Sequence, residues 1–301
     1  MVLLRRRSTT EDTTDSAVRA GAAAAEAAHA TAPARPPGEN GRPIAIGAAF
    51  FDLDNTVMRG ASIFHLARGL YARRFLGTRD IARFGLQQLR FRLGGEHMGD
   101  VDDAQDRALS FVAGYSVDEI RAIGEEIFDE FMSDKIWPGT RALAQMHLDA
   151  GRQVWLVTAA PVEIATTIAD RLGLTGALGT VPETRAGVYT GRLVGELLHG
   201  EAKAEAVRAL AIREDLDLTD CSAYSDSAND IPMLMLVGDP CAVNPDARLR
   251  RHAREHGWRI KDYRTGRKAA RIGLPAAAGV GAVAGAVVAS TAVRRRAPHR
   301  I

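Results

Sequence analysis

The sequence feature that most constrains the fold is a series of short apolar runs that end in polar residues. Four such runs are IAIGAAFFDL (44–53), RQVWLVTAA (152–160), DCSAYSD (220–226) and DPCAVN (239–244). A continuous apolar run of this length is typical of a strand that is buried on both faces of a parallel sheet. The runs therefore predict the strands of a parallel sheet, with connections long enough to cross over it.

Stretches with helical spacing lie between and after these runs, at 139–150, 162–172, 201–212 and 246–256. Strands that alternate with helices predict an α/β protein, a parallel sheet with helices on both faces. Two segments break the alternation. Residues 61–136 have helical spacing without a strand-like run, which predicts a helical insertion after the first strand. Residues 181–196, VPETRAGVYTGRLVGE, alternate around turn residues and predict a small β-hairpin beside the sheet.

The two ends of the chain differ from its middle. Residues 1–42 are rich in Ala, Thr, Arg and Pro and lack large apolar residues, so they predict a disordered N-terminal arm. Residues 272–293 carry no charge and are flanked by basic residues. The segment 263–301 is therefore expected to be a basic linker, a single transmembrane helix (272–293) and a basic tail. The alternative is a flexible or surface-lying tail, since Ala and Gly dominate the segment.

Charge and cysteine content limit the possible partners and the cellular compartment. The net charge of +2 gives no overall basic field, so a nucleic-acid partner is not expected. Two cysteines, Cys221 and Cys241, are too few for a disulfide framework and predict buried thiols in a reducing cytoplasm. With the predicted tail, the catalytic domain would be tethered to the inner face of a membrane.

Polar residues of a kind that can carry chemistry follow three of the predicted strands. They are Asp52 and Asp54 after the first, Thr158 after the second, and Asp226, Asn229 and Asp230 after the third. The carboxyl ends of parallel strands are where ligands bind in open α/β sheets. Crowded carboxylates repel one another unless a cation lies among them, and Mg²⁺ binds carboxylates together with substrate phosphate. Lys203, at the start of a helix, can neutralise further charge. The pattern predicts a Mg²⁺ and phosphate site.

Four segments in order, DLDNT, VTAAP, the lysine of GEAKAEA and YSDSANDIPML, resemble the signature motifs of the haloacid dehalogenase superfamily. The inserted helices match its phosphoserine-phosphatase-like subfamily IB, over about residues 44–262. The resemblance implies a Rossmann-like core, formed by 43–60 and 137–262, and a helical C1 cap at 61–136. It also implies a magnesium-dependent phosphatase, a phosphoric monoester hydrolase.

The resemblance assigns a role to each motif residue. Asp52 would be the nucleophile that forms an aspartyl-phosphate, and Asp54 the general acid and base. The metal ligands would be Asp52, Asp226 and the backbone carbonyl of Asp54. The remaining positions are Thr158, Ala159 and Lys203 for phosphate binding, with Thr56, Asn229 and Asp230 in support. An Asp at position 54 favours hydrolysis of a phosphate ester, or phosphotransfer.

The substrate is less constrained than the reaction. Phosphoserine phosphatases usually carry an acidic residue shortly after the first motif, and the stretch VMRGASIFHLARG has none. An arginine-rich, apolar cap and a membrane tail favour a small or lipid-like phosphomonoester. Two alternatives stay open, a phosphoserine phosphatase and a non-catalytic regulator that binds a phosphorylated ligand.

Overall fold

The computed structural model describes residues 2–33, 47–73 and 112–264. Side chains in the first helix are described from Thr14 onward. The chain divides into two compact units, residues 1–261 and 262–301, and the fold below is that of the first unit.

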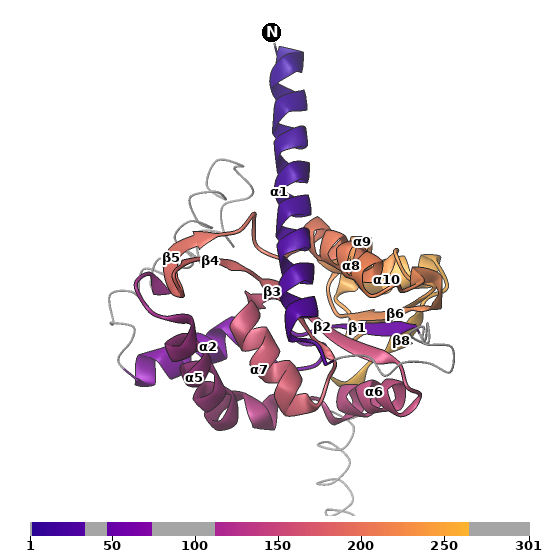
Figure 1. Ribbon diagram of the computed structural model, residues 1–301. Helices are drawn as coiled ribbons and strands as arrows, with labels where there is room; N and C mark the ends of the chain where they lie inside the picture. The colour runs from indigo at the N-terminus through magenta and orange to yellow at the C-terminus, as the bar shows by residue number, and fades with distance from the viewer. Residues whose placement is uncertain (1, 34–46, 74–111, 265–301) are drawn as a thin grey trace, which may run out of the picture. The chain divides into compact units, whose positions relative to one another are not determined.

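The core of the described part is a six-stranded parallel sheet in the order β3-β2-β1-β6-β7-β8 (Figure 1). Its central strand β1 is wholly buried, as the apolar runs predict. The strands are β1 (Ala48–Asp52), β2 (Gln153–Pro161), β3 (Gly176–Thr180), β6 (Ser222–Ser225), β7 (Asp239–Val243) and β8 (Arg259–Lys261). The predicted α/β fold is confirmed, while β3 and β8 were not predicted.

Helices cover both faces of this sheet. In Figure 1, α8, α9 and α10 lie on one side of the sheet and α6 lies on the other. Gly173 ends α7 in a left-handed conformation with φ 68°, which glycine adopts at little cost. The helices are α6 (Pro138–Asp149), α7 (Val162–Leu172), α8 (Glu201–Arg213), α9 (Ile231–Leu234) and α10 (Ala247–Glu255), with 3₁₀ turns at Leu218–Asp220 and Ala228–Asp230.

Helical segments follow β1, as the inserted cap requires. They are α2 (Ser62–Ala72), α5 (Val117–Ile127), a π-helix (Phe128–Met132) and a 3₁₀ turn (Ser133–Lys135). A capping box between Ser116 and Glu119 begins α5. Residues 74–111 of the predicted helical insertion lie outside the described residues, and the limits 61–136 stay a prediction.

The predicted β-hairpin is present as β4 (Pro182–Arg185) and β5 (Val188–Leu193). It pairs with the residues before α5, since the Gly114 amide donates to the Tyr189 carbonyl at 2.9 Å and the Tyr189 amide donates to the Tyr115 carbonyl at 3.0 Å. The hairpin therefore joins the cap to the core.

The prediction of a disordered arm at 1–42 is corrected for most of its length, because Val2–Thr31 forms the helix α1. Its C-terminal half packs against α8 and β3 (Figure 1). The sequence argument looked for large apolar side chains, but here small residues form the interface. Alanine has the highest helix propensity, and its small side chain lets two helices approach closely. The buried alanines of α1 are Ala17, Ala20, Ala24, Ala25 and Ala28.

The prediction of a membrane-spanning C-terminal helix is also corrected. Among the residues that the structure describes, no helix is both long enough and apolar enough to cross a bilayer. The segment 272–293 itself lies outside those residues. The physical reason is composition, because Ala and Gly supply little of the apolar surface that Leu, Ile and Phe bring to a membrane helix. The predicted membrane partner and the location at the inner membrane face are withdrawn with it.

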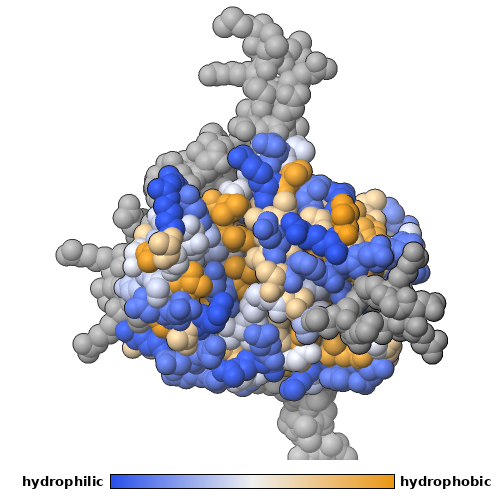
Figure 2. Space-filling view, viewed as in Figure 1, coloured by the Kyte–Doolittle hydropathy of each residue, from blue (hydrophilic) through white to orange (hydrophobic). Residues whose placement is uncertain are grey.

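Exposed hydrophobic side chains in the described part are scattered. Phe64, Ile212 and Met235 are exposed on separate segments of the chain. On the face shown in Figure 2, hydrophobic residues (orange) are interspersed with hydrophilic ones (blue). Single exposed hydrophobics of this kind are normal on a protein surface.

Replacing Gly21 tests the docking of α1. A Cβ at Gly21 would lie 2.7 Å from the Ala206 amide nitrogen, where the two helix backbones meet. We expect Gly21→Leu to lower the free energy of unfolding by about 2 kcal/mol or more, measured by urea denaturation, and to expose α1 to protease. Ala22→Leu adds the same side chain at an exposed neighbouring position and should have little effect. If Gly21→Leu and Ala22→Leu both change the free energy of unfolding only slightly, then α1 does not pack against α8.

The pH dependence of stability is expected to carry a contribution from His147. Arg152 Nη1 donates to His147 Nδ1 at 3.3 Å, and His147 Nε2 donates to the Tyr224 hydroxyl at 2.8 Å. Burial and, secondly, Arg152 lower the pKa of His147 to about 4. Folding lowers the pKa of this histidine, so the unfolded chain binds the proton at a higher pH than the folded protein does. The free energy of unfolding therefore falls as the pH falls from 6.5 toward 4.

Between pH 7.5 and pH 5, the free energy of unfolding of the wild-type protein should therefore fall by about 1 kcal/mol more than that of His147→Gln. This figure allows for solvent screening of the half-buried side chain. The free energy of unfolding at each pH is the measurement. The same substitution at the exposed His256 is the control. Parallel pH profiles for wild type and His147→Gln would contradict the expectation.

Candidate active site

The turn after β1 fixes the first two predicted residues, Asp52 and Asp54. Asp52 is the last residue of β1 and is 5% exposed. Asn55 takes a left-handed conformation with φ 58°, which Asn tolerates better than most residues. The Met58 amide donates to the Leu53 carbonyl at 2.9 Å and closes the turn. The backbone therefore carries Asp54 past the strand end in a defined geometry.

Asp54 faces the start of the inserted helices. The Ser62 amide, at the first residue of α2, donates to Asp54 Oδ1 at 2.8 Å. Burial raises the pKa of Asp54, and the hydrogen bonds from Ser62 oppose that rise only in part. A carboxyl whose protonated form is favoured in this way is suited to donating a proton.

Lys203 joins two of the predicted carboxylates. Its Nζ lies 2.5 Å from Asp52 Oδ1 and 3.0 Å from Asp230 Oδ2, and all three side chains are buried. Burial alone would lower the pKa of Lys203, but the charges of Asp52 and Asp230 raise it above its usual value. Lys203 is therefore a permanent cation at the carboxyl ends of β1 and β6.

The site has more negative charge than Lys203 can balance. Burial raises the pKa of Asp226 to about 7, with Asp230 adding to the rise. Burial also raises the pKa of Asp52; Lys203 opposes this, whereas Asp230, Asp226 and Asp54 add to it. The predicted carboxylates therefore lie close enough to repel one another, which is the electrostatic environment that a divalent cation relieves.

The other predicted residues lie at the same strand ends with differing contacts. Thr158 is buried at 2% exposure, and its Oγ1 accepts a hydrogen bond from the Ala160 amide at 3.1 Å. Ala159 presents its carbonyl to Thr180 Oγ1 at 2.8 Å. Asn229 is exposed. The hydroxyl of Thr56 is buried with no hydrogen-bond partner in the described part, so it does not bond Asp54.

Three contributors were missed by the sequence argument. Ser62 bonds Asp54, and Ser225 Oγ donates to Asp230 Oδ2 at 2.7 Å. Asn244 Nδ2 donates to the Asn55 carbonyl at 3.0 Å and supports the turn that carries Asp54. Ser225 is the last residue of β6 and Asn244 follows the last residue of β7, so the strand-end rule could have found them. Ser62 had no comparable signal.

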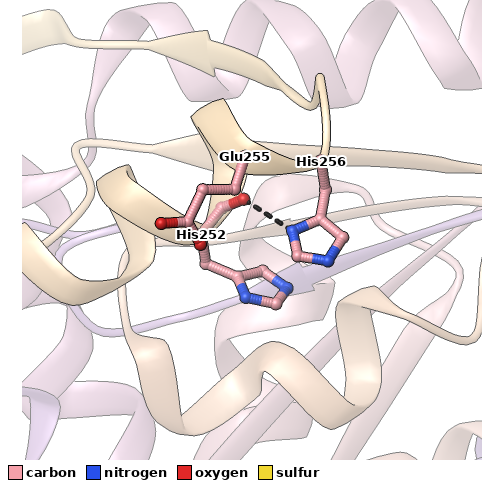
Figure 3. Close-up of side chains that lie close together, drawn as sticks. All are labelled: His252, Glu255 and His256. Atoms are coloured by element: carbon pink, nitrogen blue, oxygen red, sulfur yellow. Dashed lines mark hydrogen bonds between the residues drawn. The ribbon is translucent and has the colours of Figure 1, made fainter.

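A second group of polar side chains lies elsewhere, on α10 (Figure 3). Ligand atoms of His252, Glu255 and His256 lie within 4.8 Å of one another, and an H-x-x-E-H spacing could have revealed them. The two imidazole rings stack with centroids 3.9 Å apart, and His256 Nδ1 donates to the His252 carbonyl at 2.9 Å. Because α10 runs back from the end of β7 to the start of β8, the group lies away from the strand ends that carry Asp52.

A family model described as haloacid dehalogenase-like hydrolase matches residues 49–235. The chain belongs to this family, and within it the chain is a phosphatase. The match spans β1 to the end of α9 and includes each motif residue from Asp52 to Asp230.

Several relatives extend over most of the chain. A protein named phosphoserine phosphatase SerB1 from Mycobacterium tuberculosis is 59% identical over 249 residues, 82% of this chain and 81% of that protein. A histidinol-phosphatase from Neisseria meningitidis is 31% identical over 221 residues, 72% of this chain and 98% of that protein. A solved structure of a protein of unknown function from Bordetella pertussis is 30% identical, with a TM-score of 0.65 over 71% of this chain and 97% of that one.

Removing the Lys203 cation should destabilise the fold. Lys203→Met leaves two buried carboxylates without their partner, so we expect the free energy of unfolding at pH 8 to fall by about 3 kcal/mol. Arg208→Met on the same helix removes an exposed cation that pairs with Glu201 and Glu205, and it should cost less than about 1 kcal/mol. If urea denaturation shows the same decrease in the free energy of unfolding for both substitutions, the buried ion pairs of Lys203 stabilise the fold no more than the surface pairs of Arg208.

Proposed function

We propose that the chain is a Mg²⁺-dependent phosphomonoester hydrolase that acts through an aspartyl-phosphate on Asp52. The observation that carries the proposal is the buried Lys203 between Asp52 and Asp230, with Asp54 and Asp226 beside them. Four carboxyl groups against one lysine leave an excess of negative charge, which a divalent cation would offset.

Magnesium suits these residues because they offer carboxylate oxygens, the ligands that a hard cation prefers. Asp52, Asp226 and the backbone carbonyl of Asp54 are the proposed ligands. Asp54 would contribute its backbone carbonyl, so only Asp52 and Asp226 need to supply carboxylate oxygens. Mg²⁺ usually keeps several waters as its remaining ligands. When bound, the ion would offset the negative charge of the carboxylates and of the transferring phosphoryl group.

Asp52 is the proposed nucleophile. Its carboxylate oxygen forms a bond to phosphorus while the bond between phosphorus and the ester oxygen breaks. Lys203 holds Asp52 Oδ1 at 2.5 Å and favours its ionised form. Phosphoryl transfer depends mainly on alignment and charge stabilisation, and the end of a buried strand is a rigid support for the attacking group.

Asp54 is the proposed general acid and base. It gives its proton to the departing ester oxygen, which leaves as an alcohol. It then takes a proton from the water that attacks phosphorus, the Asp52–phosphorus bond breaks, and inorganic phosphate is released. The raised pKa of Asp54 supports the first of these steps, because it favours the protonated carboxyl.

Thr158, the backbone at Ala159 and Lys203 are the proposed contacts to the phosphoryl oxygens. Thr158 ends the regular part of β2 just before α7 begins at Val162. Backbone amides at a helix start and a buried ammonium are both suited to phosphate. Asp230 supports the site by holding Lys203 and Ser225 Oγ rather than by contacting substrate.

The proposed substrate is a small, polar phosphomonoester. Relatives named for phosphoserine and for histidinol phosphate support this class. The lipid-like ester, favoured earlier by a membrane tail, loses that support. Phosphoserine itself remains one member of the proposed class.

The test compares two substrates in two variants. Asp52→Asn should lower kcat at least about 10³-fold for every phosphomonoester, because the nucleophile is lost. Asp54→Asn should lower kcat for phosphoethanolamine about 10²-fold or more, because its departing alkoxide needs a proton. The same substitution should lower kcat for p-nitrophenyl phosphate much less. Released phosphate is measured with Mg²⁺, after chelation with EDTA, and after Mg²⁺ is restored.

Asp170→Asn, an exposed carboxyl on α7, is the matched control and should retain activity. Turnover that survives Asp52→Asn, or that EDTA leaves intact, would refute the mechanism. A complete lack of turnover with every ester would favour a non-catalytic protein that binds a phosphorylated ligand.

A further inference from the structure

The polar group on α10 combines two imidazoles and a carboxylate, three side chains that bind transition metals. His252 and Glu255 lie within α10, and His256 follows its last residue (Figure 3). Residues three and four positions apart lie on the same face of a helix. One ligand atom of each side chain therefore comes within 4.8 Å of the others. The group takes no part in the proposed phosphatase chemistry, so its role needs a separate explanation.

His256 has one ring nitrogen that is prepared for a ligand. Its Nδ1 donates to the His252 carbonyl at 2.9 Å. A carbonyl oxygen can only accept, so the proton of the neutral imidazole lies on Nδ1 and the lone pair lies on Nε2. Histidines that bind metals usually hold their other nitrogen in this way, which fixes the tautomer and the direction of the ring. The fold therefore presents His256 Nε2 as a metal ligand.

His252 has a polar atom whose requirement is not met. Its Nε2 is buried and has no hydrogen-bond partner among the residues that the structure describes. The His256 ring stacks on it with centroids 3.9 Å apart, and the Trp258 ring meets it edge-on at 4.8 Å. Buried polar atoms normally have a partner. A ligand that binds beside the two imidazoles would supply the partner that the protein does not.

Modest side-chain rotations would close the site around an ion. Zinc binds nitrogen and oxygen at about 2.0–2.2 Å, which places the ligand atoms of a tetrahedral ion about 3.4 Å apart. Glu255 and His256 are exposed, so packing does not prevent them from turning. Glu255 is 4.0 Å from Arg251 in an exposed ion pair, which contributes little. His256 also lines an open groove of about 420 Å³, which gives an ion a route from solvent.

The charge around the group selects the kind of metal. The same helix carries four arginines, at positions 248, 250, 251 and 254. They repel any cation, and the group offers only one carboxylate against them. Mg²⁺ prefers oxygen ligands and is disfavoured here. Imidazole suits the borderline ions Zn²⁺, Ni²⁺ and Cu²⁺. The group therefore differs in metal preference from the carboxylates at the strand ends.

We propose that His252, Glu255 and His256 form a second metal site, which binds a transition ion of the zinc class. Three protein ligands leave the fourth tetrahedral position to water. Because Trp258 packs on His252 and leads into β8, an ion bound here would connect the end of α10 to the last strand. Binding to the folded chain alone would stabilise it by mass action.

The experiment titrates Zn²⁺ into the untagged full-length protein by calorimetry, with Mg²⁺ in excess to compete at the strand-end carboxylates. We expect one Zn²⁺ per chain at the α10 site. His252→Gln, Glu255→Gln and His256→Gln should each raise the Kd for Zn²⁺ at least about tenfold. Glu255 and His256 are exposed, so these two variants should fold normally, which an unchanged urea midpoint without metal would verify.

His29→Gln is the matched control. His29 is an exposed helical histidine whose Nδ1 lies 2.6 Å from Glu214 Oε1, so it has a carboxylate but no second imidazole. Its replacement should leave the Kd unchanged. The proposal is overturned if Zn²⁺ does not bind, if His29→Gln weakens binding as much as His256→Gln does, or if Glu255→Gln changes the Kd no more than His29→Gln. It is also overturned if Asp226→Asn removes the ion and the α10 variants keep it.

Two further measurements locate the ion independently of affinity. In NMR spectra of histidine-labelled protein, Zn²⁺ should shift the imidazole signals of His252 and His256 and leave that of His29 in place. Zn²⁺ should also raise the urea midpoint of the wild type and not that of His256→Gln. Equal shifts of all three signals, or equal midpoints, would contradict the site. His256→Gln should retain Mg²⁺-dependent phosphate release, so the failure of either proposal leaves the other standing.

Discussion

The buried contact of Lys203 with Asp52 and Asp230 connects three parts of the fold. Asp52 ends β1, Asp230 ends the 3₁₀ turn after β6, and Lys203 lies in the first turn of α8. Two carboxylates at this depth are compatible only if a cation lies between them. The same contact that stabilises the carboxyl ends of the strands therefore also sets the charge of the proposed nucleophile.

Because Lys203 depends on α8, the packing of that helix matters for the site. One face of α8 is buried through Ala202, Ala206 and Leu210, and α1 covers part of it. Gly21 permits the backbone of α1 to approach Ala206 directly. A helix built from alanine and lacking large side chains thus supports the element that carries the central cation, which gives the N-terminal segment a structural role in the phosphatase.

Much of the fold and of the site could be predicted because strand ends are visible in the sequence. Buried strands appear as apolar runs, and Asp52, Thr158 and Asp226 follow such runs directly. The remainder depends on tertiary contacts. β3, with the sequence GALGT, is short, contains two glycines and has Thr180 as its one β-branched residue. It is buried because β2 pairs with it and α7 packs on it. Docking of α1 depends on close fit between small residues, which no periodicity of large hydrophobics reveals.

Glu163 illustrates the same limit for a single buried side chain. In the sequence it is one acidic residue in the first turn of a helix, where such residues are common. Only the packing of α2, α5 and the hairpin around it removes the carboxyl from water.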